Sequence, residues 1–309
     1  MRSWLVAVVF AILLSWSVDL EAQVPSPEPT WLDYWRQATV ALGIVKRAMV
    51  GPKGKEIEKN VFAVIGTGVL FGVEGKPPIL VSAKHVIYEP GNRWTPKNIQ
   101  LRFAWFEDRP VEDYLGVEVA LEHKGNRLWM AHPTADLMAM PLIVNSKDAG
   151  RDTVPYVPVA NFASSRDLYE GAAVMVLGYP GAVGSTFWTR ALVRGGIVAW
   201  INSKNPMGEQ FVVDSLLFPG NSGGPVFKVP SGVGRRGNIV AGDKVSFLGI
   251  VSQGRKLQMP LVATERKIEI SEPTGPISLV AEQWIGVGVV EPAERVRELL
   301  DAVMKALTK

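Results

Sequence analysis

The apolar positions of this sequence fall in many short stretches and not in long periodic runs. Between about residues 37 and 290 these stretches are rich in valine and isoleucine, and glycine, proline and asparagine separate them. Examples are residues 61–65, 78–81, 173–177 and 247–251. Strands of this length at this spacing, with almost no helical periodicity between them, predict an all-β fold built as a sandwich or a pair of barrels.

The C-terminal end follows a different pattern, with apolar residues three and four positions apart. They are Val296, Leu299, Leu300, Val303, Met304 and Leu307. This spacing places them on one face of a helix, and Pro292 suits the first turn because its missing N–H would be unbonded there. We therefore expect a packed helix over residues 292–308.

The N-terminal end has the pattern of a secretory signal. The positive charge of Arg2 precedes an apolar run from Leu5 to Leu14, and cleavage after Ala22 is compatible with the sequence. The alternative is an uncleaved anchor, but the run is shorter than the ~20 residues that a spanning helix needs. The sequence thus predicts an exported protein, periplasmic or secreted, that meets a membrane only through this segment if it stays uncleaved.

The rest of the chain divides into a short lead-in and one large unit. Residues 23–36 are a proline-rich lead-in that ends in a short helical stretch, and residues 37–309 form the main domain. Its size allows a substantial core without disulfides.

The composition limits the possible chemistry. The 309 residues contain no cysteine and three histidines, and the net charge is +3. Thiolate catalysis and cysteine-ligated zinc are therefore excluded, and the histidine spacing forms no metal signature. Basic residues are scattered and form no stripe, which argues against nucleic acid as a partner. We expect no metal and no cofactor, and the oligomeric state stays open.

The sharpest motif is a serine in a turn of glycines before an apolar strand. Residues 219–226 read Pro-Gly-Asn-Ser-Gly-Gly-Pro-Val. A nucleophilic serine needs an exposed hydroxyl and neighbouring N–H groups aimed at the oxyanion, and glycine permits the backbone that provides both. We predict Ser222 as the nucleophile, with the N–H groups of Gly220 and Ser222 as the oxyanion donors.

A serine hydroxyl needs a general base, and the three histidines are the candidates. His85 follows the apolar strand 79–83, where a barrel could fix its side chain at a cleft. His123 and His132 lie in polar loops, and we expect both at the surface.

A carboxylate must hold the histidine in the correct tautomer, and Asp136 stands at the start of another apolar strand. The chain order His85, Asp136, Ser222 separates the hydrolase classes. An α/β-hydrolase needs a histidine after the serine, and none follows residue 222. A subtilisin-like order would need an aspartate before His85, where Asp33 lies only in the lead-in. The order on an all-β chain favours a chymotrypsin-like triad.

At these residues the sequence resembles the trypsin-like peptidases, and it is closer to the bacterial HtrA/Deg-type protease domain than to the digestive enzymes. The matching blocks are residues 66–71, 80–86, 135–137, 176–180, 195–198, 214–226 and 285–288. The resemblance covers roughly residues 37–305. It implies two six-stranded antiparallel Greek-key barrels, at about 37–148 and 149–290, a C-terminal α-helix, and a protein or peptide substrate.

Two departures from the family pattern change the expected regulation. Asn221 stands where the digestive enzymes carry the aspartate that receives a newly cut N-terminus, so activation by that ion pair is not expected. No PDZ domain is expected after the helix, which puts HtrA-type peptide sensing in doubt.

The resemblance also implies a primary specificity pocket lined by Leu216, Val251, Ser252 and Gln253. Leu216 occupies the region where a trypsin-type pocket carries its carboxylate. A buried basic substrate side chain would lack a partner there, which predicts a preference for small or medium apolar residues.

The sequence as a whole predicts an exported serine endopeptidase that works through an acyl-enzyme. Ser222 would attack the scissile carbonyl, His85 would take and return the proton, and Asp136 would orient His85. One alternative is a catalytically silent binding or scaffold protein of the same fold, with loops that block the cleft. Another is an exported β-protein in which the motifs occur by chance.

Overall fold

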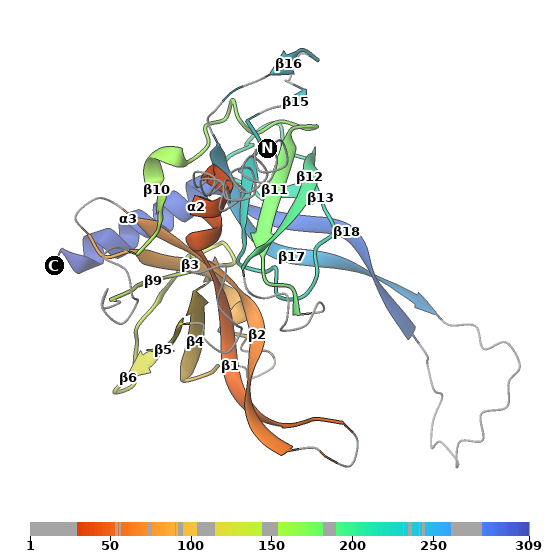
Figure 1. Cartoon of the computed structure of the whole chain (residues 1–309). Coiled ribbons are helices and arrows are strands. Elements are labelled where there is room, and N and C mark those ends of the chain that lie inside the picture. The colour runs from red at the N-terminus through yellow and green to blue at the C-terminus, as the bar shows by residue number, and fades with distance from the viewer. Residues whose placement is uncertain are drawn as a thin grey trace, which may run out of the picture.

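The computed structural model describes residues 30–52, 55, 57–72, 76–89, 91, 95–103, 115–143, 154–181, 190–230, 232–233, 237–240, 242, 245–260 and 280–308. The predicted signal at 1–22 and most of the lead-in lie outside these residues. The described part is two β-units and a C-terminal helix (Figure 1), which confirms the predicted chymotrypsin-like fold class. In this part of the chain, no helix is long and apolar enough to cross a membrane.

The N-terminal unit is one curled, mostly antiparallel sheet. Its strand order is β5-β4-β1-β2-β3-β9-β8, and β10 pairs with β2 in parallel. The strands are β1 (Thr39–Val50), β2 (Ile57–Gly72), β3 (Ile79–Ala83), β4 (Asn98–Phe103), β5 (Leu115–Ala120), β8 (Met130–Ala131), β9 (Leu137–Pro141) and β10 (Val157–Pro158). In the described pairings β5 and β8 are the edges of the sheet, and the chain between them forms the small hairpin β6 (Glu122–His123) and β7 (Asn126–Arg127). The first of the two expected barrels is therefore curled and not closed.

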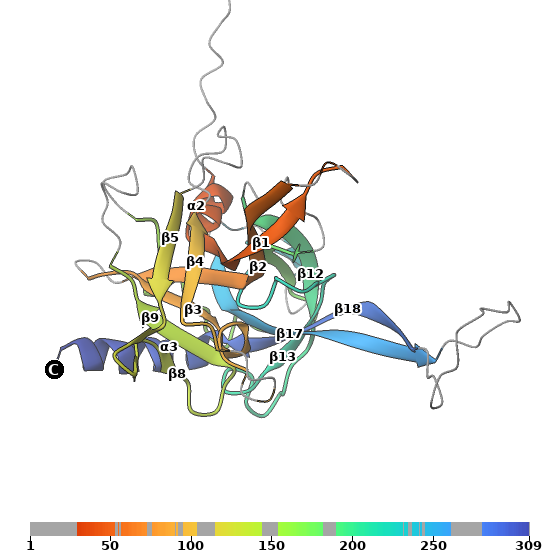
Figure 2. The same ribbon diagram turned by 90° about the horizontal axis from the view of Figure 1, so that it is seen from below.

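The C-terminal unit is a closed six-stranded barrel, as expected. Its strand order is β11-β12-β13-β18-β17-β14. The strands are β11 (Ala173–Gly178), β12 (Leu192–Trp200), β13 (Phe211–Asp214), β14 (Pro225–Lys228), β17 (Ser246–Pro260) and β18 (Val280–Pro292). The β17–β18 ladder continues beyond the barrel as a projecting hairpin, seen in Figures 1 and 2, and β15 (Gly232–Val233) pairs with β16 (Ile239–Val240) apart from it.

Alternation along β2, β3 and β9 gives the N-terminal sheet two buried faces. Even-numbered residues such as Leu70, Leu80 and Met138 pack together in the core inside the curl of the sheet. Odd-numbered residues such as Phe71 and Leu137 face a second core that reaches the C-terminal barrel and the terminal helix. Because strand side chains alternate between faces, three strands can serve both cores at once.

Two helices cover this shared core. α3 (Ala293–Leu307) packs against β9 and β17 through Val296, Leu299, Leu300 and Val303, and Figure 2 shows it beside β8 and β9. α2 (Trp31–Gln37) begins at the N-cap Thr30 and buries Trp35 against Phe227, with ring centroids 5.0 Å apart. The core therefore joins the two β-units and both helices.

Candidate active site

Strand pairing brings His85 and Asp136 together. β3 and β9 are antiparallel, and their register pairs Ala83 with Leu137. His85 lies in a 3₁₀ turn directly after β3, and Asp136 directly precedes β9. The N–H of Lys84 donates to the carbonyl of Asp136 at 3.1 Å, which continues the pairing to the two candidate residues.

Three hydrogen bonds hold the carboxylate of Asp136. One oxygen accepts the backbone N–H of His85 at 3.0 Å, and the other lies 2.6 Å from His85 Nδ1. The second oxygen also accepts the hydroxyl of Ser252 at 3.0 Å. A carboxylate on Nδ1 favours the tautomer with the proton on Nδ1, which leaves Nε2 free to accept a proton.

The serine loop needs glycine for both conformation and space. Gly220 has φ +98° and Gly223 has φ +86°, a region that residues with a Cβ rarely adopt. A Cβ at Gly223 would lie 1.9 Å from the carbonyl oxygen of Thr67, and one at Gly220 would lie 2.3 Å from that of Tyr179. The glycine frame around Ser222 is therefore required by the close approach of two neighbouring segments.

Thr67, on β2 of the N-terminal unit, braces this loop. Its N–H donates to the carbonyl of Ser222 at 2.8 Å, and its hydroxyl donates to the carbonyl of Gly220 at 2.6 Å. The same hydroxyl accepts the N–H of Tyr179 at 3.0 Å, and the carbonyl of Thr67 accepts the hydroxyl of Ser82 at 2.7 Å. Thr67 is fully buried, so these bonds are shielded from water. Residue 67 lies in the matching block 66–71, but sequence reasoning assigned it no role in the site.

The two predicted oxyanion donors are oriented by hydrogen bonds that the carbonyl of the same peptide group accepts. The carbonyl of Pro219 accepts the N–H of Gly181 at 2.9 Å, and the carbonyl preceding Ser222 accepts the N–H of Gly224 at 2.9 Å. The C=O and N–H of a trans peptide point in opposite directions, so the N–H groups of Gly220 and Ser222 point away from these partners. Among the described residues neither of the two N–H groups donates to another group.

Ser222 is linked to Asp136 through Ser252. The Ser222 hydroxyl donates to the carbonyl of Ser252 at 3.3 Å, and the Ser252 hydroxyl is the one that binds Asp136. In the described residues this is the hydroxyl's one hydrogen-bond partner, so it does not bond to His85. Nucleophile–base bonds are often long without substrate, so this geometry is compatible with the predicted pair.

The four predicted specificity residues occupy different environments. The side chain of Leu216 is 50% exposed, and Gln253 is exposed. Ser252 is fully buried at Asp136, a contact that the sequence reasoning missed when it assigned this residue to substrate binding only. Val251 is buried in the core of the C-terminal barrel, and its backbone bonds to the loop, accepting the N–H of Gly223 at 2.7 Å.

Asn221 lies inside the serine loop with an unusual environment. It is 1% exposed, and within the described residues neither atom of its side-chain amide has a hydrogen-bond partner. The amide oxygen lies beside Gly178, where a Cβ would approach it to 2.6 Å. A charge at this position would be buried, and no opposite charge among the described residues pairs with it.

The two remaining histidines differ from each other. His123 is exposed, as expected, but the expectation for His132 is wrong, because its side chain is only 4% exposed. Its ring nitrogens bond to the backbone of residues 134 and 135 and to Glu298, so the loop closes around it. The described residues contain no group of three or more histidine or acidic residues that could hold a metal ion.

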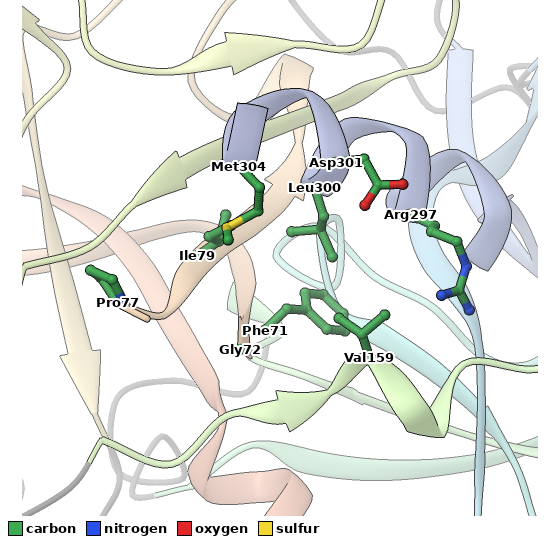
Figure 3. Close-up of a pocket in the computed structure, with 9 residues that line it drawn as sticks. All are labelled: Phe71, Gly72, Pro77, Ile79, Val159, Arg297, Leu300, Asp301 and Met304. Carbon is green, nitrogen blue, oxygen red and sulfur yellow. The ribbon is translucent and has the colours of Figure 1, made fainter. Parts of the chain in front are cut away.

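A small apolar cavity lies outside this constellation. Figure 3 shows Leu300 and Met304 of α3 facing Ile79 and Phe71, with Arg297 and Asp301 at the side. Its volume is about 60 Å³, and none of its lining residues is a candidate catalytic or specificity residue.

Comparison with known families finds a family whose model matches this chain. The sequence model described as the trypsin-like peptidase domain matches residues 66–233, which is more than half of the chain. The match contains His85, Asp136 and Ser222. Comparison with curated proteins gave no match.

Proposed function

The chain belongs to the trypsin-like peptidase domain family, and from this premise we propose that it is a serine endopeptidase with His85, Asp136 and Ser222 as its triad. The observation that carries the proposal is the 2.6 Å contact between His85 Nδ1 and Asp136 beside the serine loop. As a peptidase domain it acts on proteins. The closer likeness to HtrA/Deg-type protease domains is part of the proposal.

The mechanism is acyl transfer through an acyl-enzyme. Ser222 Oγ loses its proton to His85 Nε2 as it attacks the scissile carbonyl, and Asp136 stabilises the resulting imidazolium. His85 then gives the proton to the leaving amine, and water releases the acyl group by the same steps in reverse. The N–H groups of Gly220 and Ser222 stabilise the oxyanion in both halves of the reaction.

The proposed substrate preference is for small or medium apolar residues before the scissile bond. Leu216 supports it, because this half-exposed apolar side chain offers no opposite charge to a basic substrate residue. A peptide-library profile dominated by lysine or arginine would overturn this preference.

Export belongs to the proposal as well. The signal pattern at residues 1–22 supports a mature protein in the periplasm or outside the cell. Cell fractionation followed by N-terminal sequencing tests it, and an intact Met1 on cytoplasmic protein would contradict it.

Labelling with a fluorophosphonate probe tests the nucleophile. We expect one label on Ser222 of the purified mature protein, located by mass spectrometry, and none on Ser222→Ala. His85→Ala should label much more slowly because the hydroxyl loses its base. A folded wild-type protein that takes no label would favour the silent scaffold.

A further inference from the structure

The segment that leads into Asp136 is held by side chains. His132 Nδ1 accepts the N–H of Thr134 at 3.2 Å and the N–H of Ala135 at 2.9 Å. The N–H of Asp136 itself donates to the buried carboxylate of Glu291 at 3.0 Å. Three successive N–H groups are therefore bound by two side chains, and a ring nitrogen that accepts two of them carries no proton.

The polar face of α3 holds the other side of this segment. The Nε2 of His132 lies 2.9 Å from the carboxylate of Glu298, which accepts the ring proton. Arg295, three residues earlier on the same helix face, donates to the hydroxyl of Thr134 at 2.6 Å. It also donates twice to the carbonyl of Gly208, at 2.9 and 2.6 Å, and so ties the segment to the β12–β13 connection.

Polar contacts matter here because one flank of the segment is open. A cleft of about 420 Å³ borders it, lined by Thr134, Trp200, Glu209, Gln210, Glu291 and Arg295. Ala135 and Leu137, the residues on either side of Asp136, belong to the core shared with α3. On the side of the cleft, hydrogen bonds from His132, Glu291 and Arg295 therefore hold this segment in addition to the packing of its two apolar residues.

We propose that His132, held by Glu298 of α3, is a positioning residue that fixes Asp136 for its contact with His85. The inference rests on the proposed function, since it assigns Asp136 its catalytic role. It gives α3 a role in positioning the triad, in addition to its packing against the two β-units. His132 acts through the backbone of residues 134–136 and does not touch substrate.

Two pairs of variants separate positioning from general stability. His132→Leu fills the space but accepts no N–H, whereas the Oδ1 of His132→Asn can accept from residues 134 and 135. Glu298→Lys cannot accept the ring proton, whereas the amide oxygen of Glu298→Gln can. Glu298 is 57% exposed, so its variants test the inference even if His132→Leu fails to fold.

We expect His132→Leu and Glu298→Lys to lower kcat about 10- to 100-fold at nearly constant KM, because small displacements of catalytic groups cost this much. His132→Asn and Glu298→Gln should stay within about threefold of wild type, since each keeps its acceptor. Peptide turnover, corrected by active-site titration, gives these values, and thermal unfolding measured alongside shows how much each variant is destabilised.

A proton NMR experiment reads the position of Asp136 without any need for activity. The proton in the 2.6 Å contact between His85 and Asp136 should give a low-field signal in wild type. Loss or upfield movement of this signal in folded Glu298→Lys, with recovery in Glu298→Gln, supports the inference even if Ser222 proves unreactive and the proposed function fails. An unchanged signal and unchanged kcat in folded Glu298→Lys and His132→Leu would overturn the inference. Variants that lose thermal stability but keep both the signal and kcat would overturn it as well.

Discussion

Replacing Thr67 with valine would separate the packing role of this side chain from its hydrogen bonds. Valine has nearly the same shape, so the buried volume is preserved, but its methyl group neither donates nor accepts. The carbonyl of Gly220 and the N–H of Tyr179 would each lose a partner, at 2.6 and 3.0 Å. The backbone bond from residue 67 to Ser222 would remain.

The expected cost follows from the burial of these groups. Gly220 is buried and Tyr179 is 1% exposed, so water cannot easily replace the lost hydroxyl. A buried polar group left unsatisfied costs about 1–3 kcal/mol, which gives a loss of roughly 2–4 kcal/mol in unfolding free energy after the hydroxyl's own desolvation is subtracted. Loss of an oxyanion donor costs about 10²–10³ in kcat, and loosening one should cost roughly 10- to 100-fold.

Thr39 provides the matched control. It is also fully buried, and its hydroxyl donates to the carbonyl of Trp35 at 2.8 Å, at the end of α2 and not in the serine loop. Thr39→Val should lose about 1 kcal/mol and keep kcat near the wild-type value. Thr67→Ser keeps the hydroxyl and should restore most of the turnover.

The test measures denaturant unfolding and peptide turnover, corrected by active-site titration, for Thr67→Val, Thr67→Ser and Thr39→Val. If Thr67→Val loses stability as Thr39→Val does but keeps wild-type kcat, the hydroxyl of Thr67 does not hold the oxyanion loop and the reasoning fails.

The other predictions concern three separate parts of the chain. Asn221→Asp would bury a charge that no described residue pairs with, so we expect the free energy of unfolding to fall by about 3–5 kcal/mol at pH 7. Urea unfolding measures this loss, which should become smaller in acid, where the carboxylate is protonated. Stability equal to wild type at pH 7 would show that the site is solvated. Leu216→Asp should raise cleavage after lysine or arginine by about tenfold in a peptide library, because it supplies an opposite charge, and an unchanged profile would place residue 216 outside the pocket. The side-chain hydrogen bond with Thr30 lowers the pKa of Asp33 below its ordinary value of 3.8. The negative charge of Asp33 therefore stabilises the folded state above pH 4, and this contribution is lost as pH falls below 3.8. Asp33→Asn should therefore be less stable than wild type at pH 7 and nearly equal to it at about pH 2, and a difference that persists in acid would exclude the charge as its source.

Sequence reasoning reached the fold class because its signals are local. Short strands, the glycine loop at residues 219–226 and the 3-4 spacing of the last helix can each be read within a dozen residues. It also selected His85 and Asp136, which the β3–β9 register brings together. The open edge of the N-terminal sheet was not foreseen, since strand closure depends on pairing between segments far apart in the chain.

The contacts that support the candidate site were hidden from the sequence for the same reason. Ser252 meets Asp136 across 116 positions, and the hydroxyl of Thr67 meets Gly220 across 153. His132 looked like a surface residue because its neighbours in sequence are polar, yet Glu298, 166 positions away, closes over it. A motif indicates which residues react, whereas the residues that hold them follow from how the two β-units and the terminal helix meet. Thr67→Val and Glu298→Lys should therefore lower turnover although neither residue belongs to the triad.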